Sequence, residues 1–388
     1  MLLVACASYS TQVVKQSAKP VTVDTLQVGA ERTELYLPTL AGKNVGLVVN
    51  HTSTVDEQHL VDFLLAKGVQ VKAIYSPEHG FRGNHDAGAK VASGFDQQSG
   101  LPIFSVYGET KKPSKEMLKG IDVLVFDIQD VGVRFYTYIS TMHYIMEAAA
   151  EHDIAVVVLD RPNPNGQFVD GPILESEFQS FVGMHPIPVL HGMTVAELAQ
   201  MINGEGWLKN QVKADLTVIP VANYSRTQSY ILPIKPSPNL PNAQSINLYP
   251  SLCFFEATPV SIGRGTDFPF QVAGHDEVAF GEFEFIPRSI PGAASNPKLK
   301  GKVAKGVDLR NSSQKGLNLE LLLHVSSLFK QQGKVLFTRA QFMDKLAGTD
   351  KLRKQIDAGL TEQAIRETWQ LGLNEFKQRR QPYLLYQD

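Results

Sequence analysis

The sequence predicts an α/β protein, in which a Rossmann-like, mostly parallel sheet with helices on both faces is followed by a smaller α+β C-terminal domain. Two patterns and the chain length predict this fold. From residue 44, short apolar runs alternate with helical segments, as in proteins built on a parallel sheet. The runs are continuously apolar, which is typical of strands buried on both faces. The 388 residues also exceed what one hydrophobic core usually fills, so two domains are expected.

Six apolar runs predict the strands of the sheet. They are short and rich in β-branched residues, and Gly, Pro or charged residues bound them. In chain order they occupy residues 45–49, 71–75, 102–107, 123–126, 154–159 and 216–221.

Start signals predict the helices between these strands. A capping box at residues 54–57 predicts a helix that continues to about residue 66. Pro113 predicts the start of a second helix, and residues 136–151 predict a longer one. Another capping box, at Thr194, predicts the next helix. The resulting strand–helix alternation favours a parallel sheet whose strand ends gather polar loops at one edge.

The composition and hydrophobic pattern of the sequence change beyond about residue 224, where Pro becomes frequent and strand patterns become less obvious. Helical periodicity returns at residues 317–331, 339–347 and 361–378. Residues 287–316 are rich in Pro, Gly, Ser and Lys and predict an exposed loop. We therefore predict an N-terminal signal and tether (1–24), a Rossmann-like catalytic domain (25–223) and a C-terminal auxiliary domain (224–388).

Composition and charge exclude several classes of protein. A net charge of −2 provides no basic field for nucleic acid, so no nucleic-acid partner is expected. No run approaches the roughly 20 apolar residues of a membrane-spanning helix. The two cysteines, Cys6 and Cys253, are too few for a disulfide framework or a four-cysteine zinc site. The sequence leaves the oligomeric state open.

The N-terminus, MLLVACAS, matches a bacterial lipobox, in which the signal is cleaved before a cysteine that is then lipidated. Cys6 is the predicted lipidation site, and residues 8–23 are the predicted polar tether. The apolar stretch is short and lacks a basic start, so the signal is expected to be truncated or its start codon misassigned, and the alternative is a chance apolar N-terminus. The prediction is a periplasmic lipoprotein of the cell envelope whose membrane contact is through the lipid alone.

Motifs for nucleotide cofactors are absent from the sequence. The first predicted strand ends in VVNHTST, without the G-x-G-x-x-G turn that brings backbone close to a pyrophosphate. There is also no P-loop motif and no G-x-S-x-G nucleophile elbow. His79 and His85 do not have the spacing of common zinc ligands. The prediction is an enzyme or binding protein without cofactor or metal.

The sequence YSPEHGFRG at residues 75–83 supplies the strongest candidate for catalysis. Glu78 follows a predicted strand, where an apolar neighbourhood would raise a carboxyl pKa and suit a general acid. His79 is predicted either to orient Glu78 or to be a buried histidine bound to a backbone carbonyl. Arg82 adds a cation suited to an anionic substrate.

The sequence DIQDVGVRFYTY at residues 127–138 supplies the second group of candidates. Asp127 is predicted to fix the loop, whereas Asp130 is the candidate second carboxylate that glycosidic cleavage requires. Arg134 and Tyr136 suit an anionic sugar, because a guanidinium binds a carboxylate through two hydrogen bonds and an aromatic ring packs on a pyranose. The alternative for Arg134 is a structural ion pair with Asp130.

Further polar residues are predicted to contact substrate. Two prolines stiffen the loop that carries Asp160, Arg161 and Asn163, although Asn163 could instead start a turn. His191, before a helix start, is either a ligand or a structural residue of the helix cap. The remaining candidates are Asn239 in PSPNLP and Arg264 in a Gly-Arg-Gly sequence; the alternative for Arg264 is an exposed loop position, and Glu256 could be buried against it.

Together these stretches resemble the exo-β-N-acetylmuramidases of the NamZ type. The matching stretches are GLVVN, YSPEHGFRG, DAGAKV, SGLPIFSVYGET, DVLVFDIQDVGVRFYTYISTM, VVLDRPNPNG, DGPIL, FVGMHPIPVLHGMTVAEL, PSPNLP and FEATPVSIGRGTDFPF. They occur in order over about residues 40–275. Small departures, such as EATPVS where relatives often have EGTNVS, put one polar contact near residue 259 in doubt.

The resemblance implies an active site in a cleft between the two domains. It also implies release of terminal N-acetylmuramic acid from the non-reducing ends of peptidoglycan fragments, in cell-wall turnover. The family's catalytic glutamate in its E-H-G motif corresponds to Glu78. A murein-fragment binding module without turnover, or a carboxylic-ester hydrolase, is the alternative function. The resemblance leaves open which second carboxylate acts, the anomeric outcome and the tolerance of stem peptides.

Overall fold

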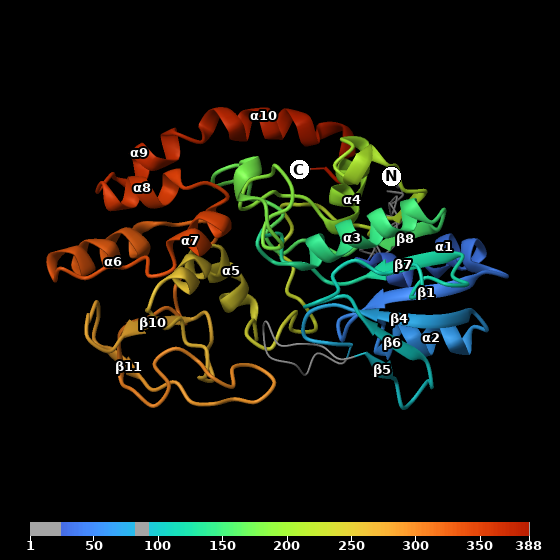
Figure 1. Ribbon diagram of the computed structural model, residues 1–388, viewed down its shortest axis with the longest axis horizontal. Helices are drawn as coiled ribbons and strands as arrows, with labels where there is room; N and C mark the ends of the chain where they lie inside the picture. The colour runs from blue at the N-terminus through green and yellow to red at the C-terminus, as the bar shows by residue number, and fades with distance from the viewer. Residues whose placement is uncertain (1–24, 82–92, 388) are drawn as a thin grey trace, which may run out of the picture.

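The computed structural model describes residues 25–81 and 93–387 (Figure 1). The predicted site residues Cys6 and Arg82 lie outside these residues. Within the described ranges, no helix is both long and apolar enough to cross a membrane.

A seven-stranded sheet organises the first half of the chain. Its strands are β1 (Asn44–Val49), β4 (Gln70–Ser76), β5 (Gly94–Phe95), β6 (Pro102–Ser105), β7 (Val123–Asp127), β8 (Ala155–Leu159) and β9 (Leu216–Ile219). They lie in the order β5-β6-β4-β1-β7-β8-β9, and only the β5–β6 pair is antiparallel. Numbered along the chain, the six parallel strands follow the 3-2-1-4-5-6 order of a Rossmann fold. The order reverses beside β1, so a ligand site is expected above the carboxyl ends of β1 and β7.

Helices cover both faces of this sheet, as predicted (Figure 1). Helices α1 (Thr33–Leu40) and α2 (Leu60–Ala66) pack on one face, where Tyr36 and Leu47 belong to one buried cluster. Helices α3 (Tyr138–Glu151) and α4 (Val195–Gly204) cover the other face, where Leu124 and Ile145 belong to a second, larger cluster. Strands with both faces covered in this way require the continuous apolar runs seen in the sequence.

The second region combines a small antiparallel sheet with helices. Strands β10 (Val272–His275), β12 (Ala304–Asp308) and β11 (Phe283–Phe285) pair in that order. The helices are α5 (Ala243–Leu252), α6 (Glu320–Gln331), α7 (Ala340–Ala347), α8 (Lys351–Asp357), α9 (Glu362–Glu367) and α10 (Gln370–Arg380). This confirms the smaller α+β region.

Three local predictions were wrong. Residues 54–59 form a hairpin of β2 (Thr54–Val55) and β3 (Gln58–His59), and α2 begins only at Leu60, where the His59 ring accepts a hydrogen bond from the Val61 N–H (3.2 Å). Residues 113–120 form turns rather than a helix. The segment 287–316 contains β12, the central strand of the small sheet, in which Ala304 is fully buried.

The C-terminal residues return to the first region. Helix α10 crosses the top of the molecule in Figure 1, from α9 toward α4. The Arg380 guanidinium donates to the carbonyls of His191 (3.1 Å) and Gly192 (2.8 Å), and the Tyr386 hydroxyl donates to Asp160 (2.5 Å). These contacts join the last residues of the chain to the first region. The domain boundary predicted at residue 223 therefore stays a prediction.

Candidate active site

Glu78 lies directly beyond β4 and is held from two other elements. The Tyr107 hydroxyl, beyond β6, donates to Oε1 (3.0 Å), and the Thr137 hydroxyl, just before α3, donates to Oε2 (2.7 Å). The side chain is half-buried. A hydroxyl can donate to a carboxylate or accept from a carboxylic acid, so these two residues orient Glu78 in either protonation state.

His79 follows in a strained backbone conformation. Its φ of 69° lies in the left-handed region, which non-glycine residues rarely adopt. The turn is closed by a hydrogen bond from the Gly80 N–H to the Pro77 carbonyl (3.1 Å), and the His79 side chain is buried. Such strain is often kept at functional sites, because the surrounding structure must maintain it.

A second histidine, His51, lies beyond β1 and faces the same region. Its Nε2 is 2.8 Å from the Lys235 carbonyl of the second region. Burial lowers the pKa of His51, and the charges of His79 and Lys235 lower it further. The loops after β1 and β4 therefore meet the segment that begins at Lys235.

Asp130 provides a second carboxyl group beyond β7. Its Oδ1 accepts a hydrogen bond from the Gly132 N–H (2.6 Å), a geometry that uses the left-handed φ of 73° at Gly132. Its Oδ2 is buried and has no hydrogen-bond partner among the described residues. Burial raises the pKa of Asp130 to about 7, so this carboxyl group holds its proton up to near-neutral pH.

Two tyrosines connect these groups to the second region. The Tyr136 and Tyr138 hydroxyls donate to the Pro236 carbonyl, at 2.8 and 3.4 Å. Burial raises the pKa of Tyr138, and the charges of Glu78 and Asp130 also raise it, so this phenol lies within the field of both carboxyl groups. Tyr136 is buried among rings and does not present an open face to a sugar.

Arg134 does not occupy the position predicted for it. Its guanidinium is fully buried and donates to the carbonyls of Pro172 (2.8 Å), Ile187 (2.7 Å) and Leu346 (3.0 Å). No carboxylate among the described residues pairs with it, and burial lowers its pKa to about 9. The geometry contradicts both the predicted lactyl contact and the alternative ion pair with Asp130, and indicates a structural residue between the two regions.

The residues beyond β8 are also bound to protein groups. Asp160 accepts from the Thr194 hydroxyl (2.7 Å) and the Ala196 N–H (3.0 Å), at the start of α4. Arg161 forms a buried ion pair with Asp127 (2.5 and 2.9 Å). This explains the structural role predicted for Asp127 and favours a structural role for Asp160 and Arg161, whose predicted contact with substrate stays a prediction.

The side chains of Asn163 and His191 bind backbone groups of the loops that follow β8 and precede α4. The Asn163 amide donates to the Met193 carbonyl (2.9 Å) and its Oδ1 accepts from the Asn165 N–H (2.8 Å), which is the turn-forming alternative. His191 Nδ1 accepts from the Met193 N–H (3.2 Å). Burial, then the charges of Arg380 and Arg134, lower the His191 pKa to about 3, so the ring is neutral. Neither residue reaches Glu78 through a described contact.

Asn239 and Arg264 belong to the second region. Arg264 pairs with Glu256 (Nε–Oε1, 2.6 Å), as proposed from the sequence, and lies over the Phe270 ring. The Asn239 amide donates to the Ala293 carbonyl (2.8 Å). Asn239 also lines a pocket of about 400 Å³, whose lining begins at Lys235 and includes Asp267. The Lys235 and Pro236 carbonyls bind His51 and Tyr136, so the segment that borders this pocket is attached to the edge of the sheet that carries Glu78.

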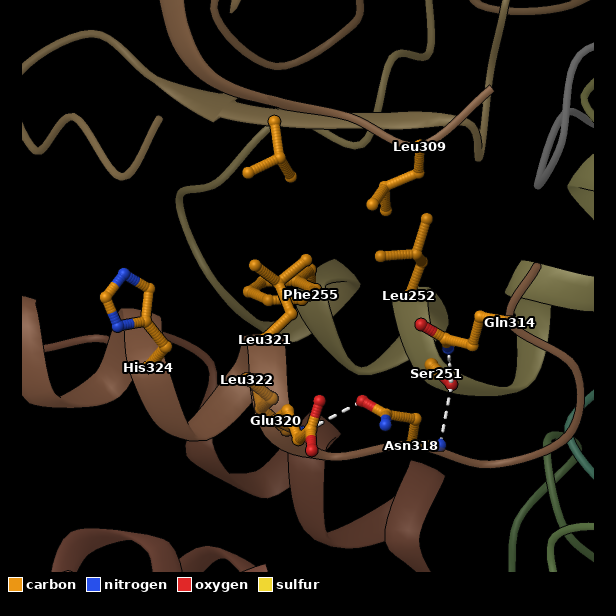
Figure 2. A pocket seen from close by; sticks show the side chains of 11 residues that line it. Ser251, Leu252, Phe255, Leu309, Gln314, Asn318, Glu320, Leu321, Leu322 and His324 are labelled. Atoms are coloured by element: carbon orange, nitrogen blue, oxygen red, sulfur yellow. Dashed lines mark hydrogen bonds between the residues drawn. The ribbon is translucent and has the colours of Figure 1, made fainter. Parts of the chain in front are cut away.

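A separate pocket of about 300 Å³ lies between α5, β12 and α6 (Figure 2). Leu252, Phe255 and Leu309 form its apolar side. The Ser251 hydroxyl at its edge is bound by Gln314 (2.9 Å) and the Asn318 N–H (2.9 Å). None of the predicted site residues that the structure describes lines this pocket.

Four residues of the site were missed from the sequence: Asn50, Tyr107, Thr137 and Tyr138. Asn50 is fully buried directly beyond β1, where its Oδ1 accepts from the Thr52 N–H (2.9 Å) and hydroxyl (2.6 Å). Each of the four follows a strand or begins a helix at the carboxyl edge. A search for hydroxyl and amide side chains at every strand end, rather than for charged ones, would have found them.

Comparison with known proteins decides the family. Residues 45–244 match the N-terminal part, and residues 247–386 the C-terminal part, of the family described as exo-β-N-acetylmuramidase NamZ. The chain belongs to the NamZ family. The two matched ranges meet near residue 245, about twenty residues beyond the predicted boundary.

Relatives of the NamZ family resemble almost the whole chain. Peptidoglycan β-N-acetylmuramidase NamZ of Bacillus subtilis (strain 168) is 39% identical over 373 residues, which cover 90% of this chain and 89% of that protein. Two crystal structures of DUF1343 family proteins from Bacteroides fragilis NCTC 9343 share the fold. One has 47% identity and a TM-score of 0.86, covering 94% of this chain and 99% of its own. The other has 32% identity and a TM-score of 0.81, covering 93% and 99%.

Proposed function

We propose that this protein is an exo-acting glycoside hydrolase that releases terminal N-acetylmuramic acid from the non-reducing ends of peptidoglycan fragments. The observation that carries the proposal is the position of Glu78: a half-buried carboxyl group at the carboxyl edge of a Rossmann-type sheet, held by two hydroxyls, in a chain of the NamZ family. The relative from Bacillus subtilis is named a peptidoglycan β-N-acetylmuramidase.

In the proposed mechanism, Glu78 is the general acid that protonates the leaving glycosidic oxygen. Tyr107 and Thr137 keep its two oxygens in place as it loses and regains the proton. Asp130 is the candidate for the second carboxyl group, because glycosidases use two carboxyls in different environments. His79 adjoins Glu78 and shapes its loop through the left-handed turn.

Hydrolysis of an aryl β-N-acetylmuraminide tests the proposal. We expect release of free N-acetylmuramic acid from the aryl glycoside, and release of single residues from the non-reducing end of a murein-derived oligosaccharide. Binding of these compounds without turnover would instead indicate a binding module. Turnover of aryl esters alone would indicate an ester hydrolase.

We also propose that the protein is a lipoprotein of the cell envelope, anchored through Cys6. The Leu3-Val4-Ala5-Cys6 sequence supports this, as does the location of peptidoglycan, the proposed substrate. Ala7, in place of Asp, after the cysteine favours the outer membrane in a host that has two membranes. Labelling of the full-length protein with radioactive palmitate should depend on Cys6, and equal labelling of Cys6→Ala would contradict the anchor.

A further inference from the structure

Among the described residues, Arg134 and Arg161 are bound to protein groups and are not free to pair with the substrate's own charge. N-acetylmuramic acid differs from N-acetylglucosamine by a lactyl ether that ends in a carboxylate. The guanidinium of Arg134 donates to three backbone carbonyls inside the protein, and Arg161 is paired with Asp127. Arg82 lies outside the described residues, so a partner for the lactyl group among the described residues has to be another cation near Glu78.

Lys235 occupies the junction between the sheet edge and the pocket in the second region. Its side chain is exposed, and it lines the pocket of about 400 Å³ together with Asn239 and Thr266. Asp267 is the other charged residue of that lining, and its carboxylate pairs with Arg288 (2.6 Å). The Lys235 ammonium makes no hydrogen bond or ion pair with any described residue. It is thus a cation that remains available to a ligand.

The backbone beneath this side chain is fixed. The Lys235 carbonyl binds the His51 ring (2.8 Å), and the next carbonyl, of Pro236, accepts from Tyr136 (2.8 Å) and Tyr138 (3.4 Å). Tyr138 lies one residue beyond Thr137, which holds Glu78. Three side chains of the sheet edge therefore fix the backbone at Lys235 near the loop that holds Glu78, which reduces the entropy lost when a ligand binds.

We propose that Lys235 binds the lactyl carboxylate of the terminal N-acetylmuramic acid and makes the site selective for residues whose lactyl group is free. This inference rests on the proposed function and names the determinant of its specificity. His51, whose ring binds the Lys235 carbonyl, lies close enough to His79 for their charges to act on each other. A lactyl group joined to a stem peptide is an amide, lacks this charge, and would gain nothing from Lys235.

The test pairs enzyme variants with substrate variants. Wild type, Lys235→Gln and Lys235→Arg are assayed on the aryl muraminide with a free lactyl carboxylate and on its lactyl methyl ester. We expect wild type to favour the free acid by about five- to tenfold in kcat/KM, mostly through KM, since an exposed charge pair contributes modestly. Lys235→Gln should lose this preference, Lys235→Arg should keep most of it, and activity on the ester should be unchanged.

Lys43→Gln is the matched control, because Lys43 is an exposed lysine at the opposite, amino edge of the sheet. It should keep the wild-type preference. Equal preference for the free acid in wild type and Lys235→Gln would overturn the inference, as would a wild type that treats acid and ester alike.

Equilibrium binding separates this inference from the proposed function. Calorimetry with Glu78→Gln protein compares N-acetylmuramic acid with N-acetylglucosamine, with and without Lys235→Gln. A preference for N-acetylmuramic acid that disappears with Lys235→Gln supports the inference even if no substrate is hydrolysed. Failure of all glycosides in turnover, with that binding preference retained, would count against the hydrolase alone. If Lys235→Gln kept both the affinity for N-acetylmuramic acid and the preference for it over N-acetylglucosamine, the proposed role of Lys235 would be overturned.

Discussion

The loops that follow β4 and β8 both place polar residues at the carboxyl edge of one sheet, yet their side chains have different surroundings. After β8, Asp160 and Arg161 are buried, and protein groups satisfy their charged atoms. After β4, Glu78 is half-buried and accepts hydrogen bonds from two hydroxyls. The comparison teaches that a polar residue at a strand end can act on a substrate when its side chain stays partly exposed. Its hydrogen-bond partners must also allow it to gain and lose a proton.

The largest expected effect concerns Glu78. Glu78→Gln keeps the shape of the side chain but cannot supply a proton, and general acid catalysis typically contributes about 10²–10⁴-fold. We therefore expect kcat on the aryl muraminide to fall by that factor while KM changes little. The loss should shrink for aryl groups with a low pKa, which leave without protonation. Steady-state kinetics with two aryl leaving groups measure both effects.

Glu34→Gln serves as the control, because Glu34 is an exposed residue of α1. It should keep wild-type activity. If Glu78→Gln retained activity within a few-fold on a poor leaving group, the acid would have to be another residue, with Asp130 next.

Arg161 tests the other side of the comparison. Arg161→Met leaves the fully buried Asp127 carboxylate without its ion-pair partner, and breaking a buried pair in this way typically costs about 3–5 kcal/mol. We expect that loss in the free energy of unfolding from urea denaturation, with kcat and KM of the remaining folded enzyme nearly unchanged. Adding Asp127→Asn should recover part of the stability. A large rise in KM without loss of stability would instead return Arg161 to substrate binding.

Sequence patterns predicted the sheet well because burial on both faces leaves continuous apolar runs, as at residues 45–49 and 154–159. They failed at residues 54–57, where TVDE has the pattern of a capping box but forms a hairpin, because a cap pattern of four residues cannot outweigh tertiary contacts. Glu78 was identified because its neighbours formed an unusual charged cluster. Arg134 was misassigned, since the carbonyls of Pro172, Ile187 and Leu346 that bind it are far apart in sequence.

Asp130 links stability to pH. Its pKa is raised by burial from 3.8 to about 7, so the folded state binds more protons than the unfolded state between these values. The stabilisation from the protonated carboxyl is fully present below pH 3.8 and is lost as pH rises toward 7 and above. One pKa unit corresponds to about 1.4 kcal/mol, so the change across this window is on the order of 4 kcal/mol.

Asp130→Asn should remove this part of the pH dependence. Urea denaturation at pH 5 and pH 8 should show that the variant, relative to wild type, is more stable at pH 8 than at pH 5. Asp160 provides a comparison from the other loop, since burial raises its pKa to about 7 as well. Its partners at α4 would lose a carboxylate acceptor in Asp160→Asn, so that variant should be destabilised at both pH values. Parallel pH profiles for wild type and Asp130→Asn would contradict a buried protonated carboxyl at residue 130.

The smallest expected effect concerns the two hydroxyls that hold Glu78. Burial and the Glu78 charge raise the pKa of Tyr107, so its phenol stays protonated and keeps its hydrogen bond at any working pH. Tyr107→Phe and Thr137→Val each remove one hydrogen bond to a charged group, typically about 1.5–3 kcal/mol when fully buried and less at a half-buried site. We expect kcat to fall about five- to tenfold in each variant, with little change in melting temperature. The double variant should lose less than the product of the two single losses, because Glu78 freed by one change gains little from the remaining hydroxyl.

In Glu78→Gln protein the same substitutions should have almost no further effect on kcat, since these hydroxyls act through Glu78. An undiminished loss in that background would show that Tyr107 or Thr137 contacts substrate directly.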